Sequence, residues 1–253
     1  MGVLLMAFVQ RGNNPLLAIK SFAQGVGLLG NPKLRKFVLI PVLINFLVYG
    51  VAFALGYYYL ADIIDQFIPG WLQWLRWILW PLFFISFFIG GFFTFTVLAN
   101  LIAAPFYGML SAAALAILSG ESATITEAPW PKVIKAELKR AAYLGSRAIP
   151  LVILSIIPGI NVLAPVLWAL FGAWGMALEY MAYPLENAGI LFSEQRKLIG
   201  SVRWGALSFG GLAAAGLALP LINIVVAPAA VIGATIYVRE LETNRAQTDI
   251  EAA

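Results

Sequence analysis

Four long stretches of the sequence carry no charged side chain, and their lengths constrain the fold more than any other feature. They are residues 37–61, 77–120, 148–178 and 204–238, about 25, 44, 31 and 35 residues long. A helix needs about 20 apolar residues to cross the ~30 Å hydrocarbon core of a bilayer. Hydrophobic residues make up 62% of the chain and charged residues 11%, against roughly half and a quarter in soluble domains. The sequence therefore predicts an all-α integral membrane protein.

Each of the first two uncharged stretches is long enough to contain a spanning helix, and the second is too long to be one simple span. The first predicts a transmembrane helix over 32–61, which includes the polar start at Pro32. The second is about twice the bilayer thickness if it is helical. We therefore expect a second long transmembrane helix and an interfacial or cytoplasmic continuation over 77–119, with a break near Pro105. The loop over 62–76 is rich in tryptophan, as is typical of a membrane–water interface.

The last two uncharged stretches are too long for one straight span and too short for two spans with a turn. Each is interrupted in its middle by similar turn chemistry, PGINVLAP at 158–165 and PLINIVVAP at 220–228, offset by 62 positions. An internal repeat is the simplest explanation. It predicts two re-entrant, partly penetrating helical hairpins, over 148–178 and 204–238, which enter and leave the membrane on the same face.

Two asparagines mark the turns of these hairpins. Unpaired backbone at membrane depth is tolerated only where it is buried in protein or lines a wet cavity. Short apolar segments that are interrupted in corresponding positions point to a permeation or binding site. Asn161 and Asn223 are therefore candidate pathway-lining residues. A local role, in which each asparagine caps its own broken helix, is the alternative.

Charge asymmetry predicts the orientation. The residues before the first span include five cations and no acid, whereas the loop over 62–76 has one arginine and two aspartates. If both hairpins are re-entrant, all remaining cations lie on the side of the N-terminus. The positive-inside rule then places the N- and C-termini in the cytoplasm.

Amphipathic and polar segments complete a single membrane domain, 1–253. An amphipathic N-terminal segment covers 1–31, and a flexible polar tail is expected over 243–253. A basic amphipathic helix over 129–147 carries cations, among them Arg140, around its polar face. This helix either lies on the membrane surface or packs, solvated, on the protein itself.

The missing residue types disfavour most hydrolase and metal-dependent chemistry. The chain has no cysteine and no histidine, which removes thiol nucleophiles, thiolate metal sites and the usual general base near neutral pH. It has no Gly-x-x-x-x-Gly-Lys-Ser/Thr loop for ATP phosphates. We expect no enzyme, no catalytic residue, no metal and no cofactor, and no nucleic acid among the partners. Glu179 and Glu186 flank the first hairpin's exit, and Glu179 is expected to pair with a nearby basic residue.

The segment GNPKLRKF crowds three cations at the start of the first span. Asn31 is a good N-cap and Pro32 a good first helical residue. Free backbone N–H groups at 33–35 and the positive end of the helix dipole would then form an anion-binding site. Arg35 and Lys36 can add charge-assisted hydrogen bonds, and an arginine fork suits oxyanions best. The alternative is an orientation anchor that contacts lipid headgroups.

Three runs of the sequence carry motifs specific enough to compare with a known family. They are NPKLRKFVLIPVLIN at 31–45, a run at 155–187 that ends in YPLEN, and a run at 203–238 that contains PLIN and APAAVIGAT. Together they resemble the CysZ sulfate-permease family of bacterial inner membranes, over nearly the whole chain. The resemblance implies sulfate uptake that feeds cysteine synthesis, a homo-oligomer, and two long transmembrane helices with two partly penetrating hairpins. This last implication agrees with the length argument, which does not depend on it.

The resemblance also implies a sulfate site. The family's motif at the start of the first span is usually Gly-Leu-Arg-Arg, whose arginines and backbone amides hold sulfate. Position by position it falls on Lys33, Leu34, Arg35 and Lys36. Lys33 replaces a glycine that lets the backbone approach the ligand, and Lys36 replaces a bidentate arginine with a point charge. These two departures predict a weaker or rebuilt site.

Two functional classes follow. In the first, the chain is an ATP-independent anion channel or secondary transporter of sulfate, and of related oxyanions, in the bacterial inner membrane. In the second, it is a non-transporting membrane scaffold or regulatory subunit that binds anionic lipid or a partner protein. Membrane lipid is an expected partner in either class, and the resemblance implies further copies of the chain.

Overall fold

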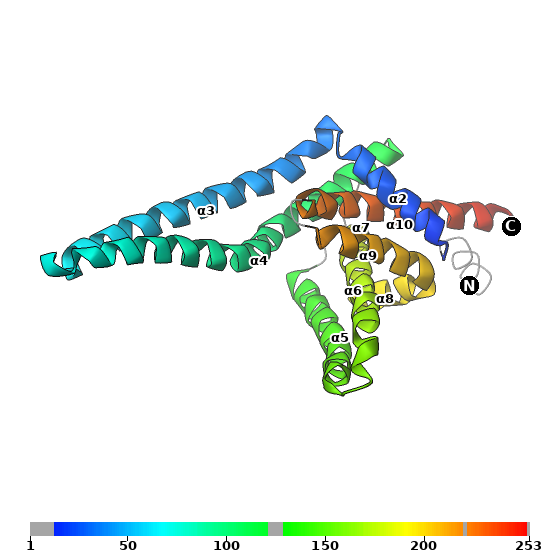
Figure 1. Ribbon diagram of the computed structural model, residues 1–253. Helices are drawn as coiled ribbons and strands as arrows, with labels where there is room; N and C mark the ends of the chain where they lie inside the picture. The colour runs from blue at the N-terminus through cyan, green and yellow to red at the C-terminus, as the bar shows by residue number, and fades with distance from the viewer. Residues whose placement is uncertain (1–12, 121–128, 220–221, 252–253) are drawn as a thin grey trace. The chain divides into compact units, whose positions relative to one another are not determined.

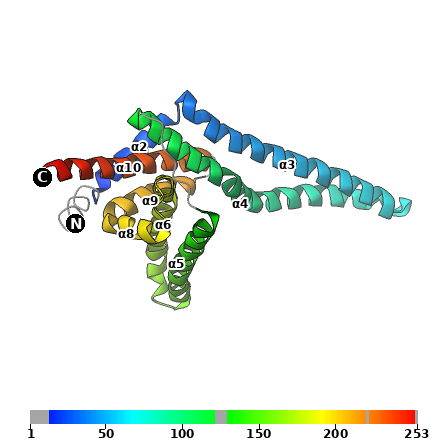
Figure 2. The same ribbon diagram turned by 180° about the vertical axis from the view of Figure 1, so that it is seen from behind.

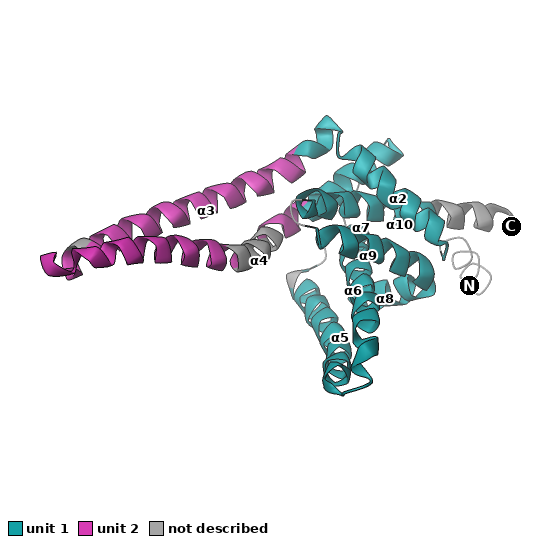
Figure 3. Ribbon diagram, viewed as in Figure 1, with its two compact units in different colours: residues 1–35, 107–253 teal, residues 36–106 magenta. Residues whose placement is uncertain are grey.

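The computed structural model of the chain describes residues 13–120, 129–219 and 222–251, and all regular structure in them is helical (Figure 1). The chain divides into two compact units, which are coloured in Figure 3. The first unit combines residues 1–35 with residues 107–253, and the second contains residues 36–106. The predicted all-α class is thus confirmed for the described residues.

Two long helices make up most of the second unit. Helix α3 (Pro32–Phe67) has 36 residues, and α4 (Arg76–Ser119) has 44 residues and continues into the first unit. A short 3-10 helix, η1 (Gly70–Leu75), joins them. Helix α4 passes through Pro105 without the break that the sequence predicts. A proline interior to a helix removes one backbone hydrogen bond but does not have to end an apolar helix whose other bonds persist.

Aromatic contacts hold α3 and α4 together within the second unit. The ring centroids of Phe53 and Phe87 lie 5.1 Å apart, and those of Tyr57 and Trp80 lie 4.6 Å apart. Many other apolar side chains described in this unit are exposed: Phe46 is 80% exposed and Trp77 is 85% exposed. An apolar surface of this extent requires lipid or another protein to cover it.

The core of the first unit is built around α10 (Asn223–Glu251), which packs against α2 (Pro15–Leu28) and α9 (Arg203–Leu217). Figures 1 and 2 both show α2 lying along α10. Glycine allows this close approach, because a Cβ on Gly233 would stand 2.9 Å from the Cα of Phe22. Helix α10 reaches into 243–253, where the sequence predicts a flexible tail. This segment has no glycine or proline to end the helix.

The first predicted hairpin turns where expected but begins earlier. Helix α5 (Trp130–Ile156) continues through Pro150, so the basic amphipathic segment and the first arm form one helix. The turn contains Gly159, whose φ of +85° favours glycine, and the 3-10 helix η2 (Asn161–Leu163). Helix α6 (Ala164–Tyr180) then packs back on α5.

Two short helices follow α6: α7 (Ala182–Asn187) and α8 (Phe192–Ser201). Helices α9 and α10, on either side of the second predicted turn, are in contact. Residues 220–221 of that turn, residues 1–12 of the N-terminal segment and the end of the tail at 252–253 lie outside the described part of the chain.

Within the described residues, five helical segments are long and apolar enough to cross a membrane. They are Pro32–Ile64, Gly70–Gly91, Ile102–Ser119, Asn161–Asn187 and Asn223–Glu242. The chain therefore has the architecture of a membrane protein with several apolar helices. Two full crossings with two re-entrant hairpins stays a prediction.

Candidate functional site

The start of α3, where the sequence predicts an anion site, is organised by Asn31. Its side-chain Oδ1 accepts a hydrogen bond from the backbone N–H of Lys33 at 3.0 Å. Its backbone carbonyl accepts from the N–H groups of Leu34 at 3.0 Å and Arg35 at 3.2 Å. The predicted N-cap is therefore confirmed.

The same contacts correct the predicted chemistry of this helix start. The N–H groups of residues 33–35 were expected to be free for an anion, but each already bonds to Asn31. The Leu34 side chain is fully buried. Leu34 thus anchors the helix start by packing, and an anion here has to be attracted by side chains.

Three side chains supply that attraction. Lys33, Arg35 and Lys36 are all exposed, and the Lys36 ammonium lies 4.9 Å from the centroid of the Phe37 ring. Among the described residues, no carboxylate lies within ion-pair distance of these three cations. All three lie in the first turns of α3. The arrangement offers uncompensated positive charge within one helical turn.

The two asparagines of the predicted hairpin turns begin helical elements. Asn161 is the first residue of η2 and is exposed, and Asn223 is the first residue of α10 and is half-buried. Neither side chain makes a hydrogen bond within the described residues, and no side-chain cap is present at η2. The alternative role as helix caps therefore has no supporting contact.

An ion cluster around a buried arginine in the first unit was not predicted as a whole from the sequence. Arg140, expected on the polar face of an amphipathic helix, is only 8% exposed. Its guanidinium lies 3.0 Å from Glu186, 3.1 Å from Glu137 and 3.7 Å from Glu179. It also donates to Gln195 Oε1 at 3.2 Å. The expected pairing of Glu179 with a basic residue is confirmed, and Arg140 is the partner.

This cluster carries more negative than positive charge. Burial raises the pKa of the Glu137 carboxyl; Arg140 opposes the rise, and the charges of Glu186 and Glu179 add to it. Three acids around one arginine do not form an anion site, and within the described residues no group of acids is arranged to hold a metal. The cluster joins α5, α6, α7 and α8. The signal for it in the sequence was Glu137-x-x-Arg140, together with two acids beside an apolar hairpin that needed a partner.

Comparison with known proteins identifies the family. Residues 21–228 match the family described as sulfate transporter CysZ/etoposide-induced protein 2.4. The chain belongs to this family. The matched range includes the cationic start of α3 and both hairpin turns. The resemblance noted in the sequence is therefore confirmed.

Individual relatives align over most of their length. A protein named sulfate transporter CysZ from Pseudomonas aeruginosa is 38% identical over 233 residues, which cover 88% of this chain and 94% of the relative. One from Pectobacterium atrosepticum is 39% identical over 223 residues, which cover 85% and 81%. These relatives of the CysZ family are named as transporters and not as enzymes.

Proposed function

We propose that this chain carries sulfate across the bacterial inner membrane, as an ATP-independent channel or secondary transporter that supplies sulfur for cysteine biosynthesis. One observation carries the proposal: 38–40% identity, over 85% or more of the chain, to relatives named sulfate transporter CysZ. The helices that are long and apolar enough to cross a membrane support it.

The anion is captured at the start of α3. Arg35 is the first contact because a guanidinium fork binds two oxygens of a tetrahedral anion, and Lys33 and Lys36 add attraction as point charges. The support is local: these cations are exposed and have no acidic partner among the described residues. Asn31 and Leu34 hold the backbone that presents them.

Helices α3 and α4 make the two full crossings in this proposal, and the hairpins dip into the membrane. At 1.5 Å per residue, the 17 residues of α6 extend about 25 Å and the 15 residues of α9 about 22 Å. As single helices both are shorter than the ~30 Å hydrocarbon core, although the longer segments Asn161–Asn187 and Asn223–Glu242 reach that length. Asn161 and Asn223 then lie at membrane depth along the anion route, and both termini are cytoplasmic.

Further copies of the chain and lipid cover the apolar surface of α3 and α4. Side chains such as Leu43, Phe46 and Trp77 are more than half exposed, and a route for a dianion has to be sealed from lipid. A homo-oligomer in the membrane meets both requirements.

Radiolabelled sulfate uptake into proteoliposomes that contain only this protein tests the function. Uptake well above that of protein-free liposomes, without ATP, is the expected result. Thiosulfate and sulfite added as competitors measure selectivity among oxyanions. Uptake at the protein-free level would contradict transport and favour the scaffold or regulatory role.

A further inference from the structure

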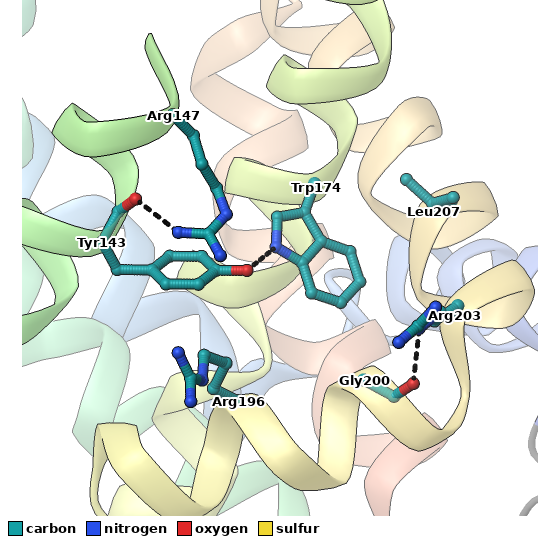
Figure 4. A pocket seen from close by; sticks show the side chains of 7 residues that line it. All are labelled: Tyr143, Arg147, Trp174, Arg196, Gly200, Arg203 and Leu207. Carbon is teal, nitrogen blue, oxygen red and sulfur yellow. Dashed lines mark hydrogen bonds between the residues drawn. The ribbon is translucent and has the colours of Figure 1, made fainter. Parts of the chain in front are cut away.

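The first unit contains a second concentration of positive charge, in a cavity of about 410 Å³ between α5, α6, α8 and α9 (Figure 4). Three guanidinium groups line it, those of Arg147, Arg196 and Arg203, beside the aromatic rings of Tyr143 and Trp174. It shares no residue with the cationic start of α3.

Tyr143 organises two of the three arginines. The guanidinium carbon of Arg147 lies 3.6 Å from the centroid of the Tyr143 ring, and that of Arg196 lies 5.2 Å from it. Figure 4 shows the two guanidiniums on opposite sides of the ring. A hydrogen bond of 3.2 Å from Arg147 to the Tyr143 carbonyl also fixes the first one. Stacking on an aromatic face attracts a cation weakly and leaves its N–H edges available.

The remaining donors of the cavity are also available. Trp174 donates its indole N–H to the Tyr143 hydroxyl at 3.1 Å, so the hydroxyl keeps its own proton to donate. Arg203 uses its Nε to bond the Gly200 carbonyl at 3.1 Å, which leaves its two terminal nitrogens free of described partners. Arg196 makes no hydrogen bond to any described residue.

No acid in the described part of the chain balances this charge. Within the described residues, Arg147, Arg196 and Arg203 have no ion-pair partner, and the acids around Arg140 do not reach them. Like charges that share a cavity repel one another, and a bound anion removes the repulsion. Guanidinium groups and a hydroxyl donor match the oxygens of a tetrahedral anion.

We propose that this cavity is a second anion site, which binds a tetrahedral oxyanion between Arg147, Arg196 and Arg203. Free sulfate and the phosphate of an anionic lipid headgroup share this chemistry. The cavity volume lies in the range of small-molecule sites, and its walls combine tyrosine, tryptophan and arginine as membrane interfaces do. The site goes beyond the proposed function, because it requires no transport and does not involve Arg35.

The test measures sulfate binding in an Arg35→Ala background, with the protein in lipid-free maltoside micelles and radiolabelled sulfate as the probe. In that background the start of α3 has lost its guanidinium, so that the cavity contributes more of the measured binding. Because the assay measures binding and not uptake, a failure to transport sulfate does not affect the result. Arg196→Gln is expected to weaken sulfate binding about tenfold, as for the loss of a charge-assisted hydrogen bond. Lys197→Gln, which removes a neighbouring exposed cation of α8 that does not line the cavity, is the matched control and leaves binding within about twofold.

A second arm separates the two sources of the anion. Phosphatidylglycerol is added to the micelles, and its retention is counted by native mass spectrometry for the same variants. Lower lipid retention in Arg196→Gln but not in Lys197→Gln, with sulfate binding unchanged, assigns the site to a headgroup phosphate. Arg203→Gln has to change the same readout in the same direction, and it decides the outcome if Arg196→Gln does not fold. If neither arginine variant differs from Lys197→Gln with either probe, the site does not exist.

Discussion

At the scale of single residues, the start of α3 shows why the proposed anion site has to rely on charged side chains and not on backbone N–H groups. Asn31 occupies the N–H groups that a free helix start would offer, through its side chain and its carbonyl. The sequence identified the cap correctly, and the same cap removes the donors that were expected to hold the anion. Side chains that extend beyond the cap, Arg35 above all, retain their donors.

Arg35→Ala is therefore expected to lower sulfate uptake into proteoliposomes at least tenfold, which corresponds to the loss of one charge-assisted hydrogen bond. Arg35→Lys keeps the positive charge but loses the guanidinium fork, so its sulfate uptake is expected to lie between those of the wild type and Arg35→Ala. Lys20→Ala, which removes an exposed cation of α2, is the control and keeps uptake near the wild-type rate. Wild-type uptake by Arg35→Ala would remove this residue from the transport route.

The ion cluster of Arg140 makes a prediction about pH. Because burial raises the pKa of Glu137, the folded chain binds this proton more readily than the unfolded chain. The contribution of Glu137 to stability is complete below the unfolded pKa and is lost as the pH rises through the higher folded pKa. Glu137→Gln removes this dependence. The gain in melting temperature between about pH 7 and pH 5 is therefore expected to be smaller in Glu137→Gln than in the wild type.

Glu194→Gln is the matched control for this pH effect, since Glu194 is an exposed acid on α8 outside the cluster. Both variants are measured by thermal unfolding in the same detergent. An equal pH dependence of wild type and Glu137→Gln would contradict the assigned role of burial.

At the scale of elements, the helices of the first unit approach one another through glycine. A Cβ on Gly210 of α9 would overlap the backbone of Ala173 in α6 and stand 2.7 Å from the Ala177 nitrogen. By contrast, a Cβ on the adjacent Gly211 would lie 3.8 Å from the Ala173 Cβ, an ordinary contact. These neighbouring glycines therefore differ sharply in their tolerance of a methyl group.

Gly210→Ala is expected to destabilise the protein by about 1–3 kcal/mol, because rigid backbone on α6 has to move aside. Gly211→Ala is expected to be neutral or slightly stabilising, since alanine has the higher helix propensity. Unfolding in detergent, followed by circular dichroism, compares the two variants. Equal midpoints would show that α6 and α9 are not packed as closely as the structure places them.

At the scale of the whole molecule, the sequence was sufficient to predict those features that depend on the length of uncharged stretches and on local chemistry. The long helices, the turns near Asn161 and Asn223 and the cap at Asn31 followed from uncharged lengths, proline, glycine and asparagine. The pairing of Glu179 with a basic residue was expected, but the full Arg140 cluster and the arginine cavity were not, because both join residues from α5 and α8 that only tertiary packing brings together. The continuity of α4 through Pro105 was missed because proline chemistry alone does not decide where a helix in lipid ends.

The topology itself can be tested with single cysteines, because the chain has none of its own. Asn161→Cys and Asn223→Cys place a thiol at each hairpin turn, and Gln73→Cys places one on the exposed surface of η1, in the loop predicted to face outside. An impermeant maleimide added to intact cells is expected to label Gln73→Cys and neither hairpin position. In inverted vesicles the labelling of Gln73→Cys is lost, because η1 then faces the lumen. In each hairpin one helix, α6 or α9, extends about 25 Å or less, which is short of a hydrocarbon core of ~30 Å. Hairpin thiols that react in intact cells as readily as Gln73→Cys would show that the hairpins cross the membrane.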